Sequence, residues 1–340
     1  MPGKRAMAEP DSEELNVSNL IETKSRRSPA GESPQASARY VIDPDLLIHS
    51  PHRCVEPDPR NPERAFIRTE NCLFAVFGSG LPPDHIPIVT ILAELEAAAL
   101  ATCSELRMGF PDQDALKCAW DQWYEFMLTV SLWNANAESQ NPSGCWVRLP
   151  GTSELKFAEI FEPKTRETIH RLETRLHNNG AMLVTSNPNL VYLHGVDEAR
   201  FNNGLCRPME VYTPGTYEVV VQSYRKILGT CDHTQVRICI GLKSFSRPDR
   251  YLWIPYEANI LKTLYSYLEH HLGRMPAPLR YYAITSFEPS QSDEESFRAV
   301  APQSILDENT RPHRAVDGLL YVENLSEVTD LTQRMAPDVA

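Results

Sequence analysis

The sequence predicts an α/β domain in which helices flank a central mixed sheet. Short apolar segments with strand-like alternation occur in the C-terminal half, and segments with helical periodicity separate them. The chain has 340 residues, which is enough for one large domain or two small ones with a buried core. Its apolar share of 42% is ordinary for a water-soluble fold.

The first predicted helices lie in the N-terminal half, after proline-rich loops that run to about residue 64. The segment 72–78 is too short for periodicity to separate strand from helix, whereas 88–106 reads as a helix with Asp84 as a candidate cap. A second helix is expected over 113–136. Its apolar residues recur at intervals of three and four, which predicts one stripe that packs into a core: Trp120, Trp123, Tyr124, Met127 and Leu128.

The later predicted elements are helices and strands in alternation. A helix over 157–178 should stop at "NNG", where Gly180 is the expected left-handed cap. The others, in chain order, are two strand pieces hinged at Pro188 (181–193), a short helix (217–228), a strand (235–243), a helix (256–272) and a last strand (280–286).

Composition divides the chain into three parts. Residues 1–40 are rich in Ser, Pro, Glu and Arg and are expected to be disordered, 41–286 should form the α/β domain, and 287–340 reads as an acidic, loosely ordered tail. The net charge of -12 is unevenly distributed, since 221–280 holds nine basic residues against four acidic ones. A local basic island suits contact with phosphates, although a solvated surface is the plainer alternative.

The cysteines and the apolar segments indicate the compartment. Eight cysteines are scattered without a CxxC pair, as expected of reduced thiols in a cytosolic or nuclear protein. No apolar run is long enough to span a bilayer, and the charged N-terminus does not read as a signal peptide. We therefore expect a cytoplasmic protein, or a nuclear one in a eukaryote, without a membrane partner.

The residues that carry chemistry follow the strand at 235–243. Alternation places Lys243 at the end of this strand, on the face opposite its apolar side chains. Glu257 comes fourteen residues later, near the start of the next helix, where a carboxylate suits the helix dipole. Between them lies "RPDR", with Arg247, Asp249 and Arg250 on a loop stiffened by proline.

This pattern resembles the CCGG-recognising type II restriction endonucleases of the PD-(D/E)xK nuclease fold. In that group a strand ends in lysine and the glutamate is displaced onto the following helix, which gives K-x13-E; Lys243 and Glu257 have that spacing. An Arg-x-Asp-Arg reader begins four residues after the lysine, where "RPDR" stands. The segment "VTSNPNLV" (184–191) looks like the family's T-S-N-P-D. The resemblance covers roughly 116–272, and its catalytic and recognition core is 181–272.

The resemblance implies a three-layer sandwich and Mg²⁺-dependent, sequence-specific cleavage of double-stranded DNA. Lys243 would stabilise the transition state, and Asn189 and Glu257 would bind the metal. A further carboxylate comes from an upstream helix, for which Glu125 is the best candidate, with Asp121 and Glu94 behind it. A plain surface carboxylate is the alternative interpretation of Glu125.

One position departs from the family pattern, because Asn189 stands where the family has its metal-binding aspartate. An amide offers Mg²⁺ a neutral oxygen, so the site should lose affinity. Asp197 or Glu198 could compensate if the fold brings either one close. Gly241 is a milder departure, at a position two before the lysine that often holds a small polar residue.

For recognition, the resemblance assigns base reading to Arg247, Asp249 and Arg250. Arginine can bond guanine O6 and N7 bidentately, and aspartate can accept from cytosine N4. A CCGG core is a palindrome, so a homodimer or higher homo-oligomer would present two such loops.

Two other functions stay open. The chain could be a DNA-binding protein on the same fold with impaired cleavage, because of Asn189. It could also be a non-enzymatic interaction or shell protein, but that interpretation does not explain the spacing of Lys243, "RPDR" and Glu257.

Overall fold

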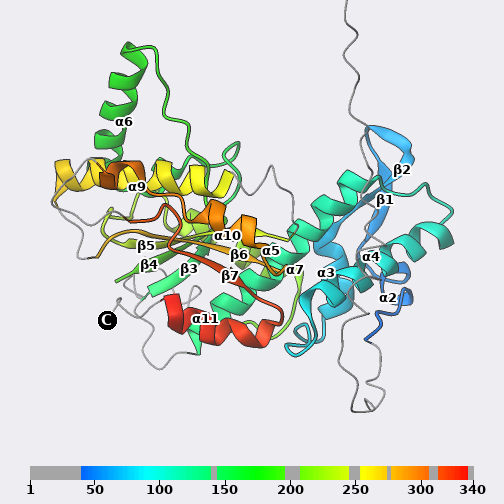
Figure 1. Cartoon of the computed structure of the whole chain (residues 1–340). Coiled ribbons are helices and arrows are strands. Elements are labelled where there is room, and N and C mark those ends of the chain that lie inside the picture. Colours follow the sequence, from blue (N-terminus) through cyan, green and yellow to red (C-terminus); the bar gives the residue numbers. More distant parts are fainter. Residues whose placement is uncertain are drawn as a thin grey trace, which may run out of the picture. The chain divides into compact units, whose positions relative to one another are not determined.

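The computed structural model describes residues 40–138, 144–195, 207–244, 253–273, 277–305 and 313–335. At its centre is a five-stranded sheet, so the predicted mixed sheet is confirmed (Figure 1). The first three strands pair antiparallel and the last three pair parallel. In spatial order they are β3 (Gly144–Arg148), β4 (Leu190–His194), β5 (Val236–Lys243), β6 (Arg280–Thr285) and β7 (Gly318–Tyr321).

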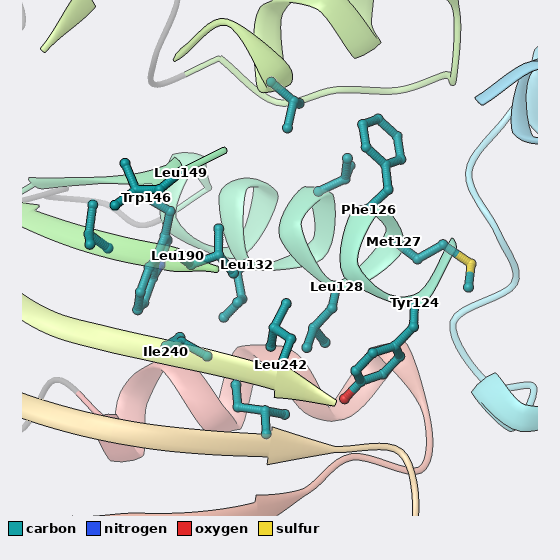
Figure 2. Close-up of a cluster of buried hydrophobic side chains, with 14 of the residues drawn as sticks. Tyr124, Phe126, Met127, Leu128, Leu132, Trp146, Leu149, Leu190, Ile240 and Leu242 are labelled. Atoms are coloured by element: carbon teal, nitrogen blue, oxygen red, sulfur yellow. The ribbon is translucent and has the colours of Figure 1, made fainter. Parts of the chain in front are cut away.

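Helix α5 (Gln113–Ala137) packs against one face of this sheet. The Asp112 side chain caps it by accepting from the Ala115 N–H at 2.8 Å. All five residues of the predicted apolar stripe are buried. Figure 2 shows Leu128 and Leu132 of α5 directed toward Ile240 and Leu242 of β5. The apolar face of β5 therefore meets α5, which confirms the role predicted for that helix.

Helix α9 (Trp253–Leu272) lies over the opposite face of the sheet and contacts α6 (Pro163–Asn178). Strand β5 is buried along its length except for Lys243, because helices cover both of its faces. Gly180 has a φ of 72°, as expected for the residue after α6.

The N-terminal part of the described chain differs from the prediction. Where we expected proline-rich loops, β1 (Val55–Asp58) and β2 (Asn61–Ile67) form an antiparallel hairpin. Prolines are tolerated there because each strand has a free edge. Three helices accompany it: α2 (Asp45–Ile48), α3 (Thr69–Phe77) and α4 (Ile88–Glu105). Asp84 does not cap α4; Pro87 precedes that helix without a side-chain cap, and the Asp84 carbonyl accepts from the Ser326 N–H.

The described residues after 286 form regular elements, whereas we expected a loosely ordered tail there. Strand β7 completes the central sheet, and α11 (Val328–Met335) packs against α5 through three buried apolar residues. The ammonium of Lys262, with a side chain only 4% exposed, lies 2.8 Å from the Asp317 carboxylate, which fixes the approach to β7. The remaining elements here are α10 (Gln291–Phe297), η4 (Pro302–Ile305) and η5 (Leu325–Glu327).

Other differences concern element boundaries. The first strand piece expected after Gly180 does not form, and β4 begins only at Leu190. The predicted helices over 157–178 and 217–228 are each broken by a short 3₁₀ turn, and the pieces besides α6 are η1 (Phe157–Ile160), α7 (Pro214–Val221) and η3 (Ser223–Lys226). Within the described ranges, no helix has both the length and the apolar character of a membrane span.

Candidate active site

The candidate site lies where β5 ends. Lys243 is the last residue of this strand and is half-buried. Strand β4 runs antiparallel to β5 with Leu190 opposite Ile240, so the residues just before Leu190 come close to the end of β5. Helices α5 and α9 approach the same end from the two faces of the sheet. The end of β5, the residues before β4, and helices α5 and α9 are thereby gathered around Lys243.

Glu257 of α9 is the carboxylate on the face that also carries Lys243. Its two oxygens each accept a hydrogen bond at 2.6 Å, Oε2 from the Ser186 hydroxyl and Oε1 from the Tyr281 hydroxyl. Burial raises the pKa of Glu257 above its usual value, while the two hydroxyl donors and the charge of Lys243 act in the opposite direction. Glu257 thus lies within range of the charge of Lys243.

Asn189 immediately precedes β4, and both polar atoms of its side-chain amide form hydrogen bonds. Its Oδ1 accepts from the Leu242 N–H at 2.8 Å, one residue before the lysine. Its Nδ2 donates to Oε2 of Glu125 at 2.9 Å. The segment from Ser186 to Asn189 therefore contacts both carboxylates, one through a hydroxyl and the other through an amide.

Glu125 of α5 is part of the site rather than a plain surface carboxylate. Its second oxygen, Oε1, accepts from Nε of Arg148 at 2.6 Å. The two side chains are 17% and 21% exposed, so this ion pair is shielded from solvent on most sides. Asp121, one turn earlier on α5, accepts from the Ser244 hydroxyl directly after Lys243. Both predicted carboxylates of α5 consequently face the end of β5.

One other predicted residue lies apart from this group. The Glu94 carboxylate accepts from the Ile42 N–H at 3.4 Å, in the N-terminal part of the fold, so Glu94 is not brought to the end of β5. Five further residues fall outside the described ranges: Asp197, Glu198, Arg247, Asp249 and Arg250.

Gly241 is explained by its neighbour on β6. A side chain at position 241 would begin 2.9 Å from the Tyr281 hydroxyl and 3.6 Å from Cγ1 of Ile254. The phenol occupies that space and uses it to reach Glu257. Burial raises the pKa of Tyr281 well above its usual value, so the phenol stays protonated and donates. A hydroxyl from β6 thus occupies the space beside position 241.

This arrangement predicts the effect of filling position 241. Gly241→Ala should lower the free energy of unfolding by about 1–3 kcal/mol, because the new methyl group overlaps the Tyr281 oxygen. Tyr281→Phe removes that oxygen, so the double variant should lose less than the sum of the two single variants. Urea unfolding of the four proteins measures this coupling. Strictly additive losses would show that the two positions do not share the space.

Three residues of the site were not predicted from the sequence: Arg148, Ser186 and Tyr281. Ser186 lies inside the quoted "VTSNPNLV" segment, so its position offered a signal. Arg148 ends β3 as Lys243 ends β5, and a basic residue closing an apolar strand is a recognisable pattern. Tyr281 gave no signal, because its contact with Glu257 depends on the parallel pairing of β5 with β6.

The side chains of the site offer the oxygen donors that a hard cation prefers, but they provide too few negative charges. Glu125, Asn189 and Glu257 all offer oxygen, which Mg²⁺ prefers. Nevertheless, no three Asp, Glu, His or Cys side chains among the described residues are grouped so that they could hold a metal ion. Each donor oxygen already accepts a hydrogen bond from the protein. A divalent ion would therefore compete with Arg148 for the Glu125 carboxylate.

The chain is similar to known restriction endonucleases in sequence and in structure. Residues 78–337 match the family described as Cfr10I/Bse634I restriction endonuclease. The chain is 24% identical over 228 residues to the Type II restriction enzyme Cfr10I of Citrobacter freundii, which covers 66% of this chain and 79% of that protein. The crystal structure of the Type IIF restriction endonuclease Bse634I with cognate DNA has a TM-score of 0.79 and 25% identity, covering 85% of this chain and 99% of the other. A second Bse634I structure, also 25% identical, has a TM-score of 0.77 and covers 85% and 98%.

Proposed function

This chain belongs to the Cfr10I/Bse634I restriction endonuclease family, and from that premise we propose that it cleaves double-stranded DNA at a G·C-rich palindromic site. The family has the fold and the site-specific deoxyribonuclease activity of type II restriction enzymes. A CCGG core is the recognition sequence implied by the resemblance of the "RPDR" segment to the base-reading segment of CCGG-recognising enzymes. The observation that carries the proposal is the gathering of Asn189, Lys243 and Glu257 around the end of β5.

Lys243 is the residue we assign to the scissile phosphate. An ammonium group at the rim of a half-buried site can bind a phosphate oxygen and stabilise the charge that develops during hydrolysis. The charge of Lys243 acts on Glu257, which is itself fixed by hydrogen bonds from Ser186 and Tyr281. Hydrogen bonds from Ser186 and Tyr281 therefore preorganise the Glu257 carboxylate near Lys243.

The family uses a divalent metal, and we propose Mg²⁺ because the available donors are oxygens. Glu257 and Asn189 would hold it, with Glu125 next to them. When bound, the ion would neutralise charge on the phosphate and acidify a water molecule. The protein's own contribution is to orient the phosphate through Lys243 and to exclude bulk water.

A second candidate function is a DNA-binding protein with impaired cleavage. The contacts of Asn189 favour it, because the amide bonds Glu125 and the Leu242 N–H at the position where the family has a charged ligand. We therefore expect the wild type to bind its site well and to cut it slowly. Sequence-specific binding is common to both candidates.

The active form is proposed to be a homodimer or a larger homo-oligomer. A palindromic site presents the same base edges twice about a two-fold axis, so two copies of the chain can read it symmetrically. The described cysteines are all free thiols, which agrees with a proposed place of action in the cytoplasm.

Base reading is tested by substitutions in "RPDR". Arg247→Ala and Arg250→Ala should each weaken binding to the G·C-rich site by about 1–3 kcal/mol, the value of a lost bidentate contact to guanine. Fluorescence anisotropy with the G·C-rich duplex and with an A·T-substituted duplex measures the difference. Lys226→Ala removes an exposed charge of η3 and provides the control, since the loss of a phosphate contact should affect both duplexes alike. If Arg247→Ala weakens both duplexes equally, Arg247 does not read bases.

A further inference from the structure

Arg148 places a positive charge next to the Glu125 carboxylate. It ends β3, the strand that pairs with β4 on the side away from β5. Its Nε donates to Glu125 at 2.6 Å, within a pair of side chains that are each about four-fifths buried. A charge-assisted hydrogen bond of this length in a shielded place is a strong interaction.

Asn189 completes the arrangement from the other side of Glu125. Its amide donates to the second carboxylate oxygen, and its own oxygen accepts from the backbone of β5. An aspartate at position 189 would set a second negative charge against Glu125 across a contact of 2.9 Å. Two carboxylates at that separation need a cation or a proton between them. The Asn189 amide is uncharged and Arg148 already pairs with Glu125, so this site needs neither a further cation nor a proton.

We infer that Arg148 is the built-in cation of this site, and that it allows the chain to bind duplex DNA without a divalent metal. The ion pair removes the charge of Glu125, and Asn189 adds none, so the phosphate backbone meets less repulsion at the end of β5. The same pair lowers the affinity of the site for a metal, because an incoming ion must compete with Arg148 for the Glu125 carboxylate.

The first test needs no variant and rests on the proposed function, since it uses duplex DNA. Anisotropy measures the affinity for the G·C-rich duplex in EDTA and in excess Ca²⁺, an ion that accepts the same oxygen donors. We expect the two dissociation constants to agree within about threefold, because the internal cation is present in both conditions. Dependence on Ca²⁺ of about tenfold or more would overturn the inference.

Variants at position 148 assign the effect to that residue. Arg148→Met keeps the apolar stem without the charge, and should weaken binding in EDTA by about tenfold, with recovery in Ca²⁺. Arg148→Lys keeps the charge and should stay independent of Ca²⁺. Arg166→Met, on the exposed surface of α6, is the matched control and should show no change that Ca²⁺ reverses. Arg148→Met binding in EDTA as tightly as the wild type would contradict the assignment.

A metal titration without DNA separates this inference from the proposed function. Isothermal calorimetry with Mg²⁺ alone should give Arg148→Met an affinity about tenfold higher than that of the wild type, because the competitor for Glu125 is gone. The Arg148→Lys variant should resemble the wild type. Equal affinities for Arg148→Met and wild type would overturn the inference even if the DNA site is as proposed. Absence of duplex binding in both EDTA and Ca²⁺ would instead contradict the proposed function.

Discussion

Lys243→Met is expected to slow the cleavage of duplex DNA by about a thousandfold or more, because it removes the positive charge assigned to the reacting phosphate. Lys243 ends β5 next to Glu257, and the methionine retains the apolar part of the side chain. Affinity for the G·C-rich duplex should fall only severalfold, since one phosphate contact among several is lost. Single-turnover cleavage with a labelled duplex separates the two effects.

The matched control for this variant is Lys164→Met, which removes an exposed lysine in the first turn of α6. Its cleavage rate should remain within about threefold of the wild-type rate, as expected for a solvated charge far from the reacting atoms. A Lys243→Met protein that keeps more than about one tenth of the rate would exclude Lys243 from the reaction.

Asn189→Asp should have the opposite effect and raise both Mg²⁺ affinity and the cleavage rate by about tenfold or more. The aspartate supplies a charged oxygen beside Glu125 in place of a neutral amide. The gain should increase further when Asn189→Asp is combined with Arg148→Met, because Glu125 is then released as a ligand. If the wild type already cuts briskly and the Asn189→Asp variant is no faster, another carboxylate has the metal-binding role.

Stability provides a second readout for the same substitution. In EDTA, Asn189→Asp should lower the free energy of unfolding by about 1–3 kcal/mol, because the bond from Asn189 to Glu125 becomes a contact between two carboxylates. Added Mg²⁺ should restore the loss by binding only the folded form. Asn187→Asp is the control in the same segment: it loses its bonds to the carbonyls of Pro150 and Leu155, and Mg²⁺ should not restore it.

Much of the fold could be predicted from the sequence because periodicity records burial directly. The stripe from Trp120 to Leu128 is buried as its spacing predicts, and β5 lies where apolar alternation ends at Lys243. The C-terminal part was misjudged because its many acidic residues suggest disorder. Its apolar residues are few but well placed, and α11 buries Leu331 and Met335 against α5.

The candidate site was predictable only where its chemistry depends on spacing along the chain. Lys243 and Glu257 are joined by one strand-to-helix connection, so their offset is visible in the sequence. Arg148 and Tyr281 enter the site from β3 and β6, and their contacts depend on the register of neighbouring strands. Register follows from the packing of the whole sheet. The departure from the family pattern at Asn189 is visible in the sequence, but the contact of Arg148 with Glu125 is not.

The most direct test of the account is to sequence the DNA ends produced by the wild type and by Asn189→Asp in Mg²⁺, with Lys243→Met as the inactive control. We predict that both active proteins cut at one G·C-rich palindrome, at positions related by its two-fold axis, and that the wild type cuts more slowly. Ends scattered over unrelated sequences, or the same ends produced equally fast by Lys243→Met, would contradict it.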